Sequence, residues 1–168
     1  MSDGPVRDAA PSAVRSVSIT SESKQAAVVR AAVDAFAAEL GANQSDRSNL
    51  VLAIDEAVCN VIKHGYRGQP GQPIDVRLER LSQKGRTGLR VVIRDQGRQI
   101  DPTEIVGRDL DDVRPGGLGT HIIRSIMDEV EYRRQETSGM ELRMVKWLSG
   151  TRGSSPAGGS AQRGISAS

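Results

Sequence analysis

The chain has 168 residues, of which 23 are basic and 21 acidic, giving a formal net charge of +2. This length predicts one domain with a sizeable hydrophobic core. Because the charge is nearly balanced and aromatic residues make up only 2% of the chain, the composition lacks the basic surface and the stacking platform of a nucleic-acid-binding protein.

Hydrophobic spacing along the chain predicts both strands and helices. The expected elements are a strand at 14–20, helices at about 22–40 and 45–64, strands at about 74–79 and 89–94, a short helix at about 102–106, a helix at about 117–127, and strands at about 129–135 and 139–147. Ser45 or Asp46 is the expected N-cap of the second helix, and Gly65 its end. This order predicts an α+β fold in which helices pack on one face of a mostly antiparallel mixed sheet.

Both ends of the chain lack hydrophobic periodicity. Residues 1–13 and 149–168 are dominated by small and polar residues, which predicts flexible tails around a single domain at 14–148. No apolar run approaches the ~20 residues of a membrane span, and the single cysteine excludes an internal disulfide. We therefore expect a cytoplasmic protein with no membrane and no nucleic acid among its direct partners.

A carboxylate and an amide interrupt the second helix in the stretch DEAVCNVIKH. Glu56 and Asn60 are four residues apart, so they project from the same face of the helix, one turn from each other. Such a pair can face a ligand. It can also cap or bond neighbouring groups on a half-exposed helix, which the spacing alone does not exclude.

The stretch RDQG follows directly on an apolar strand. Asp95 therefore lies where a strand meets a loop, and its carboxylate can accept hydrogen bonds from an amino group. Gly97 allows a flat ligand to approach the backbone closely. The same residues are also found in ordinary turns, so this motif by itself leaves both interpretations open.

A glycine-rich stretch, RPGGLGTH, precedes the helix expected at about 117–127. Glycines that open a helix let backbone N–H groups converge on phosphate oxygens, at the positive end of the helix dipole. The spacing matches neither a Walker loop nor a dinucleotide fingerprint. A hinge or a cluster of cap glycines is the alternative interpretation.

The three motifs together resemble the GHKL ATPase superfamily, which includes gyrase-type ATPases and histidine kinases. More narrowly, the chain resembles the anti-sigma-factor serine/threonine protein kinases of that superfamily. DEAVCNVIKHGY is similar to the family's N-box, RDQGRQIDP to its first glycine box, and PGGLGTHIIRSIMDEVEYR to its second. The resemblance covers about residues 14–148 and implies the two-layer α/β sandwich of a Bergerat-type ATP-binding fold.

The resemblance implies a role for each motif residue. Glu56 would be the catalytic base, and Asn60 would bind ATP through a Mg²⁺ ion held by its amide oxygen. Asp95 would accept the adenine amino group, with Gly97 beneath the ring. Backbone N–H groups for the phosphates would come from Gly116, Gly117, Leu118, Gly119 and Thr120.

The implied activity is a cytoplasmic protein kinase that uses ATP and Mg²⁺. It would phosphorylate an anti-sigma-factor antagonist, sequester a sigma factor and form a homodimer. The alternative is a nucleotide-gated regulatory binding protein with little or no kinase activity. Met140 favours this alternative, because family members often carry a threonine after the glycine that corresponds to Gly139.

Overall fold

The computed structural model describes residues 13–106 and 117–152. The strands are β1 (Val14–Thr20), β2 (Pro73–Gln83), β3 (Arg86–Asp95), β4 (Glu129–Arg134) and β5 (Met140–Arg152). The α-helices are α1 (Ala26–Glu39), α2 (Gln44–Asn60), α3 (Pro102–Val106) and α4 (Gly117–Ile126). A 3₁₀ turn at Ser23–Gln25 leads into α1, and a π-helical turn at Val61–Gly65 continues α2.

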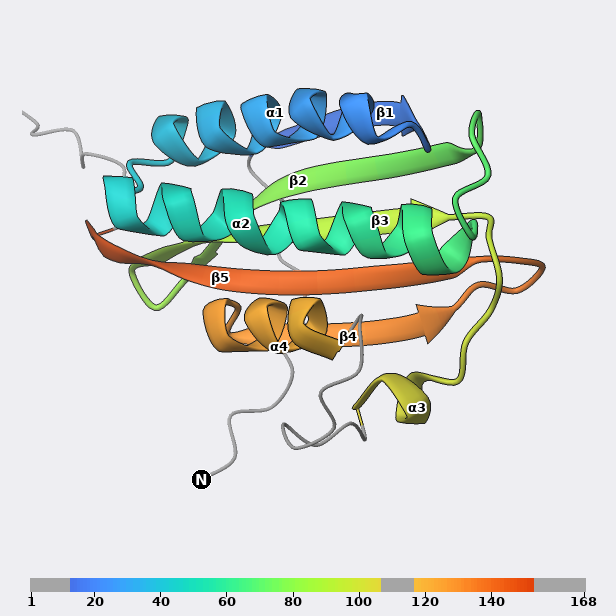
Figure 1. The fold of residues 1–168 in the computed structure, drawn as a ribbon. Helices are drawn as coiled ribbons and strands as arrows, with labels where there is room; N and C mark the ends of the chain where they lie inside the picture. The colour runs from blue at the N-terminus through green and yellow to red at the C-terminus, as the bar shows by residue number, and fades with distance from the viewer. Residues whose placement is uncertain (1–12, 107–116, 153–168) are drawn as a thin grey trace, which may run out of the picture.

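The five described strands form one sheet in the order β1-β2-β3-β5-β4. Each of its four pairings is antiparallel, where the sequence had allowed for a mixed sheet. Figure 1 shows α1, α2 and α4 side by side on one face of this sheet, with α2 between the other two. The expected two-layer α+β architecture is confirmed.

Alternating residues of the strands meet the helices in a single core. On β2, for example, Ile74, Val76 and Leu78 are buried while Asp75 and Arg77 between them are exposed, as expected for a strand with one covered face. The central helix α2 contributes a fully buried apolar stripe of Leu50, Ile54 and Val58. Because this stripe faces the sheet, polar residues of α2 must lie on its flanks or its outer face.

The N-terminus of α2 differs from the expectation. The N-cap is Asn43, whose side chain accepts a hydrogen bond from the Asp46 N–H at 2.8 Å, so the prediction of Ser45 or Asp46 was wrong. Asp46 is instead buried, and its carboxylate accepts the backbone N–H of Ser149 at 2.7 Å. This contact lies on β5, which continues to Arg152, beyond the predicted end at 147.

The π-helical turn that ends α2 was not expected either. The Tyr66 N–H closes this turn by donating to the Val61 carbonyl at 2.9 Å. Just beyond the turn, the Gly68 N–H donates to the Ile62 carbonyl at 2.8 Å. Turns of this kind are rare and often lie at functional sites. Here the wider turn brings Gly65 against the loop that follows β3, where the Arg98 N–H donates to the Gly65 carbonyl at 2.9 Å.

Candidate active site

The Glu–Asn pair of α2 faces the start of α4. Glu56 and Asn60 are both half-buried, and α4 packs along this side of α2. A Cβ built on Gly119 would lie 2.7 Å from Glu56 Oε2 and 3.5 Å from Asn60 Oδ1. Glycine at position 119 therefore allows the first turn of α4 to touch both polar side chains. The structure thus brings together two motifs that lie about sixty residues apart in the sequence.

The first turn of α4 is formed by the residues from Gly117 to Thr120. N–H groups in the first turn of a helix have no partner within the helix, and the helix dipole favours an anion at this end. Leu118 is 69% exposed. Because its side chain lies in solvent, it does not cover the backbone N–H groups of this turn. Gly116 lies outside the described residues, and its predicted phosphate contact stays a prediction.

Asp95, the last residue of β3, is a buried carboxylate that is only 4% exposed. Its Oδ1 accepts the N–H groups of Gly97 at 2.8 Å and Met140 at 3.3 Å. Burial raises the pKa of this carboxyl, and the two backbone hydrogen bonds oppose the rise. Within the described residues no lysine or arginine pairs with Asp95, and Oδ2 receives no hydrogen bond. That oxygen is therefore available to an amino group of a ligand.

Glycines line the segments that surround Asp95. A Cβ on Gly97 would lie 2.5 Å from the Gly65 carbonyl oxygen, so the loop after β3 can pack on the π-helical turn only with glycine there. Gly139, with φ of +77°, donates its N–H to the Gly97 carbonyl at 2.9 Å, and a Cβ on it would overlap the Asp95 carbonyl oxygen. Gly97 thus has a structural requirement in addition to its predicted place beneath a flat ligand.

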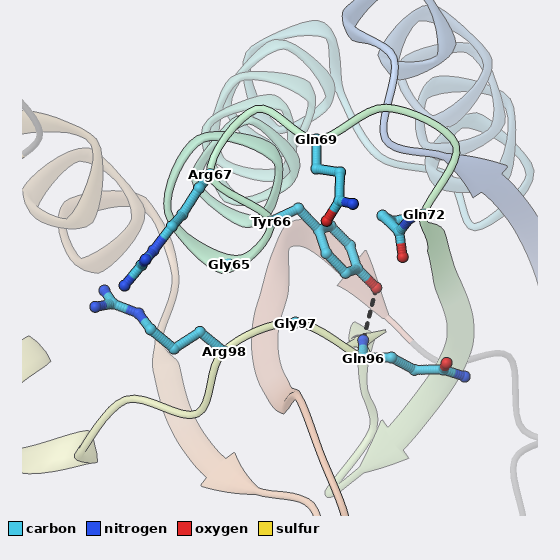
Figure 2. Close-up of a pocket in the computed structure, with 8 residues that line it drawn as sticks. All are labelled: Gly65, Tyr66, Arg67, Gln69, Gln72, Gln96, Gly97 and Arg98. Carbon is cyan, nitrogen blue, oxygen red and sulfur yellow. Dashed lines mark hydrogen bonds between the residues drawn. The ribbon is translucent and has the colours of Figure 1, made fainter.

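Tyr66 is a residue of the site that the sequence reasoning missed. Its ring is buried, its hydroxyl donates to the Pro73 carbonyl at 2.5 Å, and it accepts the Gln96 N–H (Figure 2). Burial also raises the pKa of this hydroxyl, which keeps it in the neutral, donating form. Gln96 lies between Asp95 and Gly97, so the tyrosine fixes the loop that carries both. A tyrosine directly after the helix-ending glycine was the available signal.

Met140 contacts Asp95 through its main chain. Its side chain is buried, 7% exposed, and offers no hydroxyl group to a ligand or a water molecule. The main-chain hydrogen bond to Asp95 does not depend on the side chain. The departure from the family pattern at this position therefore leaves the support of the carboxylate in place.

The described side chains do not by themselves form a metal site. Among residues 13–106 and 117–152, no three side chains of His, Cys, Asp or Glu are grouped to hold a metal ion. A Mg²⁺ ion at Asn60 would thus need oxygen ligands from a bound nucleotide. Cys59 is half-buried, and burial together with the charge of Asp55 raises its thiol pKa, so it is not poised to react.

No helix in the described segments has the length and apolar character needed to cross a membrane.

Comparison with known proteins identifies a family for the chain. Residues 19–146 match the histidine kinase-like ATPase domain family. The chain is 28% identical over 142 residues to the serine-protein kinase RsbW of Bacillus velezensis, a match that covers 80% of this chain and 85% of that protein. It is 30% identical over 142 residues to the serine-protein kinase RsbW of Halalkalibacterium halodurans, covering 79% and 82% respectively.

The fold also matches a solved structure. The crystal structure of the RsbU and RsbW domains of Rv1364c from Mycobacterium tuberculosis superposes with a TM-score of 0.55 at 20% sequence identity. The match covers 82% of this chain and 32% of that longer chain. At this identity the likeness supports the fold alone.

Proposed function

The chain belongs to the histidine kinase-like ATPase family, and we propose that it is an ATP-dependent serine/threonine protein kinase. Its substrate would be a protein that antagonises an anti-sigma factor, and the kinase would itself sequester a sigma factor. The relatives named serine-protein kinase support this proposal. The observation that carries it in the structure is the contact of Gly119 with Glu56 and Asn60.

Phosphoryl transfer depends mainly on positioning and on neutralising charge. The first turn of α4 offers N–H groups to a phosphate directly beside Asn60, whose amide oxygen is a suitable ligand for Mg²⁺. When bound, Mg²⁺ would neutralise charge on the triphosphate. Glu56 lies one turn away on α2, where its carboxylate can accept the proton of an attacking hydroxyl group. In this proposal the chain would therefore supply a base and phosphate contacts at one point.

Adenine recognition would depend on Asp95. The buried carboxylate has one oxygen free of protein donors within the described residues, and such an acceptor pairs with the adenine amino group. Guanine presents a carbonyl oxygen at the same place, which would repel the carboxylate and leave it unpaired. We therefore propose ATP and ADP as the nucleotides of this site, in preference to GTP.

The remaining features of the proposal come from the family resemblance. We propose the cytoplasm as the location of the protein and a homodimer as its assembly. Its partners would be the antagonist and the sigma factor, with no direct contact with nucleic acid or membrane. The relatives named serine-protein kinase favour this function over the alternative of a nucleotide-gated binding protein, for which ATP binding through Asp95, Asn60 and the first turn of α4 would suffice.

Transfer of labelled phosphate from ATP to candidate antagonist proteins tests the proposal. Glu56→Gln should bind ATP as the wild type does but transfer phosphate about 10²-fold more slowly, whereas Asn60→Ala should weaken Mg²⁺-dependent ATP binding itself. Glu129→Gln, an exposed glutamate at the start of β4, is the matched control and should behave as the wild type. Transfer at the wild-type rate in Glu56→Gln would contradict the assigned base. ATP-dependent partner binding without any transfer would favour the alternative function.

A further inference from the structure

A second pocket lies at the end of the sheet beyond the C-terminus of α2. It has a volume of about 420 Å³ and is lined by residues of the segments 65–72 and 96–98. Glu56, Asn60, Asp95 and Gly119 do not line it. The pocket therefore adjoins the candidate nucleotide site and shares Gly97 with it, but it extends away from that site along the turn after α2. We call it the arginine pocket, after Arg67 and Arg98.

The charges in this pocket are unbalanced. Figure 2 shows Arg67 and Arg98 on one flank with their guanidinium groups directed toward each other, and Gln69, Gln72 and Gln96 elsewhere around the cavity. Both arginines are exposed, and neither side chain bonds or pairs with any residue that the structure describes. None of the described residues that line the pocket is acidic. Two positive charges thus face a polar cavity with no counter-charge among residues 13–106 and 117–152.

The backbone holds the two arginines together. Arg67 has a φ of 52°, in the left-handed region that a non-glycine residue occupies at a cost of about 1 kcal/mol or more. The Arg98 N–H donates to the Gly65 carbonyl at 2.9 Å, and this contact requires glycine at position 97. The turn after α2 and the loop after β3 are therefore joined. This joint keeps the Cα atoms of the two arginines on neighbouring segments, so that both guanidinium groups can reach one anion.

We infer that the arginine pocket binds acidic side chains of the protein substrate. This inference rests on the proposed kinase function. Guanidinium groups pair with carboxylates through two parallel hydrogen bonds, and two arginines side by side suit a short acidic segment better than a single charge.

The nucleotide itself is a less suitable occupant. Among its predicted contacts, Gly97 lines the pocket, but Asp95 for the base and Asn60 for the phosphates do not. In Figure 2 the two guanidinium groups extend toward the side on which α4 lies. A protein whose acidic residues occupy the arginine pocket would therefore lie beside the entrance to the nucleotide site, where its hydroxyl group must arrive.

The test uses the whole protein and a fluorescent hexaglutamate peptide, with a hexaglutamine peptide as the neutral probe. The double variant Arg67→Gln/Arg98→Gln should bind hexaglutamate about tenfold more weakly than the wild type, with ATP affinity unchanged. Arg67→Lys/Arg98→Lys keeps both charges but not the paired hydrogen bonds. Its affinity for hexaglutamate should therefore lie between those of the wild type and the glutamine variant. Lys24→Gln/Arg124→Gln removes the same net charge from exposed positions elsewhere and should bind hexaglutamate as the wild type does.

Once an antagonist protein that the kinase phosphorylates is identified, the glutamine variant should show a raised KM for the unphosphorylated form of that protein and an unchanged kcat. Equal loss of hexaglutamate binding in the Lys24/Arg124 control would show that net charge alone is responsible, and would overturn the inference. Loss of ATP affinity in Arg67→Gln/Arg98→Gln, or competition by inorganic phosphate at the level of the peptide, would assign the pocket to phosphate instead. Because peptide binding needs no phosphate transfer, the pocket can be tested even if the kinase proposal fails.

Discussion

The hydroxyl oxygen of Tyr66 lies 2.7 Å from the backbone nitrogen of Gln96 and accepts its N–H. The same hydroxyl donates to the Pro73 carbonyl at 2.5 Å. One side chain therefore joins the turn after α2, the start of β2 and the loop after β3. Because Asp95 immediately precedes Gln96, we expect the position of the buried carboxylate to depend on Tyr66, whose hydroxyl bonds to backbone groups and not to the carboxylate.

Removing this hydroxyl should weaken both the fold and nucleotide binding. Tyr66→Phe keeps the ring but leaves the Gln96 N–H and the Pro73 carbonyl without their partner, at a cost of about 1–3 kcal/mol in the free energy of unfolding. ATP affinity should fall as well, since the loop that carries Asp95 is released. Urea denaturation and calorimetric titration with ATP measure the two effects.

Tyr132→Phe is the matched control for this prediction. The Tyr132 ring also packs against the core, but its hydroxyl forms no hydrogen bond with any described residue. Its removal should leave ATP affinity unchanged. If Tyr66→Phe loses stability but keeps wild-type ATP affinity, Tyr66 is a structural residue only and does not position the site.

Asp95→Asn should make the protein more stable while making it a poorer ATP binder. Burial raises the pKa of this carboxyl above its ordinary value of 3.8, so the charged form is disfavoured in the folded protein. Its contribution to stability is therefore greatest below pH 3.8 and is lost as the pH rises through the raised pKa. The neutral amide removes this penalty, and its oxygen can still accept the N–H groups of Gly97 and Met140.

The binding measurements for Asp95→Asn follow from the same chemistry. Wild-type affinity for ATP should weaken as the pH is lowered through the raised pKa, because protonation weakens the acceptor for the adenine amino group. At neutral pH the asparagine variant should bind ATP about tenfold more weakly or worse and discriminate less against GTP. Equal ATP affinity in the two proteins would leave Asp95 a turn residue.

Much of the fold was predictable because it depends on local periodicity. The alternation of Ile74, Val76 and Leu78 with charged residues and the apolar spacing of α2 each identify an element and its buried face. The strands of the first hairpin are longer than predicted because the turn needs only Lys84 and Gly85, which both adopt positive φ. Periodicity specifies which residues are buried, and it says less about where a strand ends.

The sequence nominates residues for the candidate site but does not specify their geometry. Glu56 and Asn60 stand out because they interrupt an apolar helix, and Asp95 stands out because it ends an apolar strand. Their arrangement depends on features without a periodic signal, namely the π-helical turn at Val61–Gly65 and the clamp formed by Tyr66. Asn43 was missed as the N-cap for a similar reason, since the tertiary contact of Asp46 with Ser149 decides which side chain is free to cap.

Gly119→Ala should separate catalysis from stability. The new methyl group would lie 2.7 Å from Glu56 Oε2, an atom at the end of a flexible side chain that can rotate away. Alanine also favours a helix over glycine by about 0.5–1 kcal/mol, so thermal stability should be unchanged or higher. Phosphate transfer should fall about 10²-fold because the displaced carboxylate no longer meets the substrate hydroxyl. Single-turnover kinetics with labelled ATP measure this loss.

Ser125→Ala is the control for that change, since Ser125 lies on the same helix and bonds only to the Ile122 carbonyl among the described residues. It should transfer phosphate at nearly the wild-type rate. A Gly119→Ala protein with full activity would show that Glu56 can act from another rotamer, or that the base is a different residue.

Unlike Gly119→Ala, Gly97→Ala should destabilise the protein, because its new methyl group would meet backbone atoms rather than the end of a flexible side chain. Its Cβ would lie 2.5 Å from the carbonyl oxygen and 2.7 Å from the carbonyl carbon of Gly65, and neither atom can rotate away. The loop after β3 must then move off the π-helical turn, which breaks the hydrogen bond from the Arg98 N–H to Gly65. We expect a loss of about 1–3 kcal/mol in the free energy of unfolding, the usual cost of overpacking. ATP affinity should fall with it, and hexaglutamate binding too, since Arg67 and Arg98 are no longer held together. Denaturation, calorimetry and peptide fluorescence on one sample measure stability, ATP affinity and hexaglutamate binding respectively. A variant that loses stability but keeps both ligands would show that the contact between Gly65 and Gly97 is not what positions the two sites.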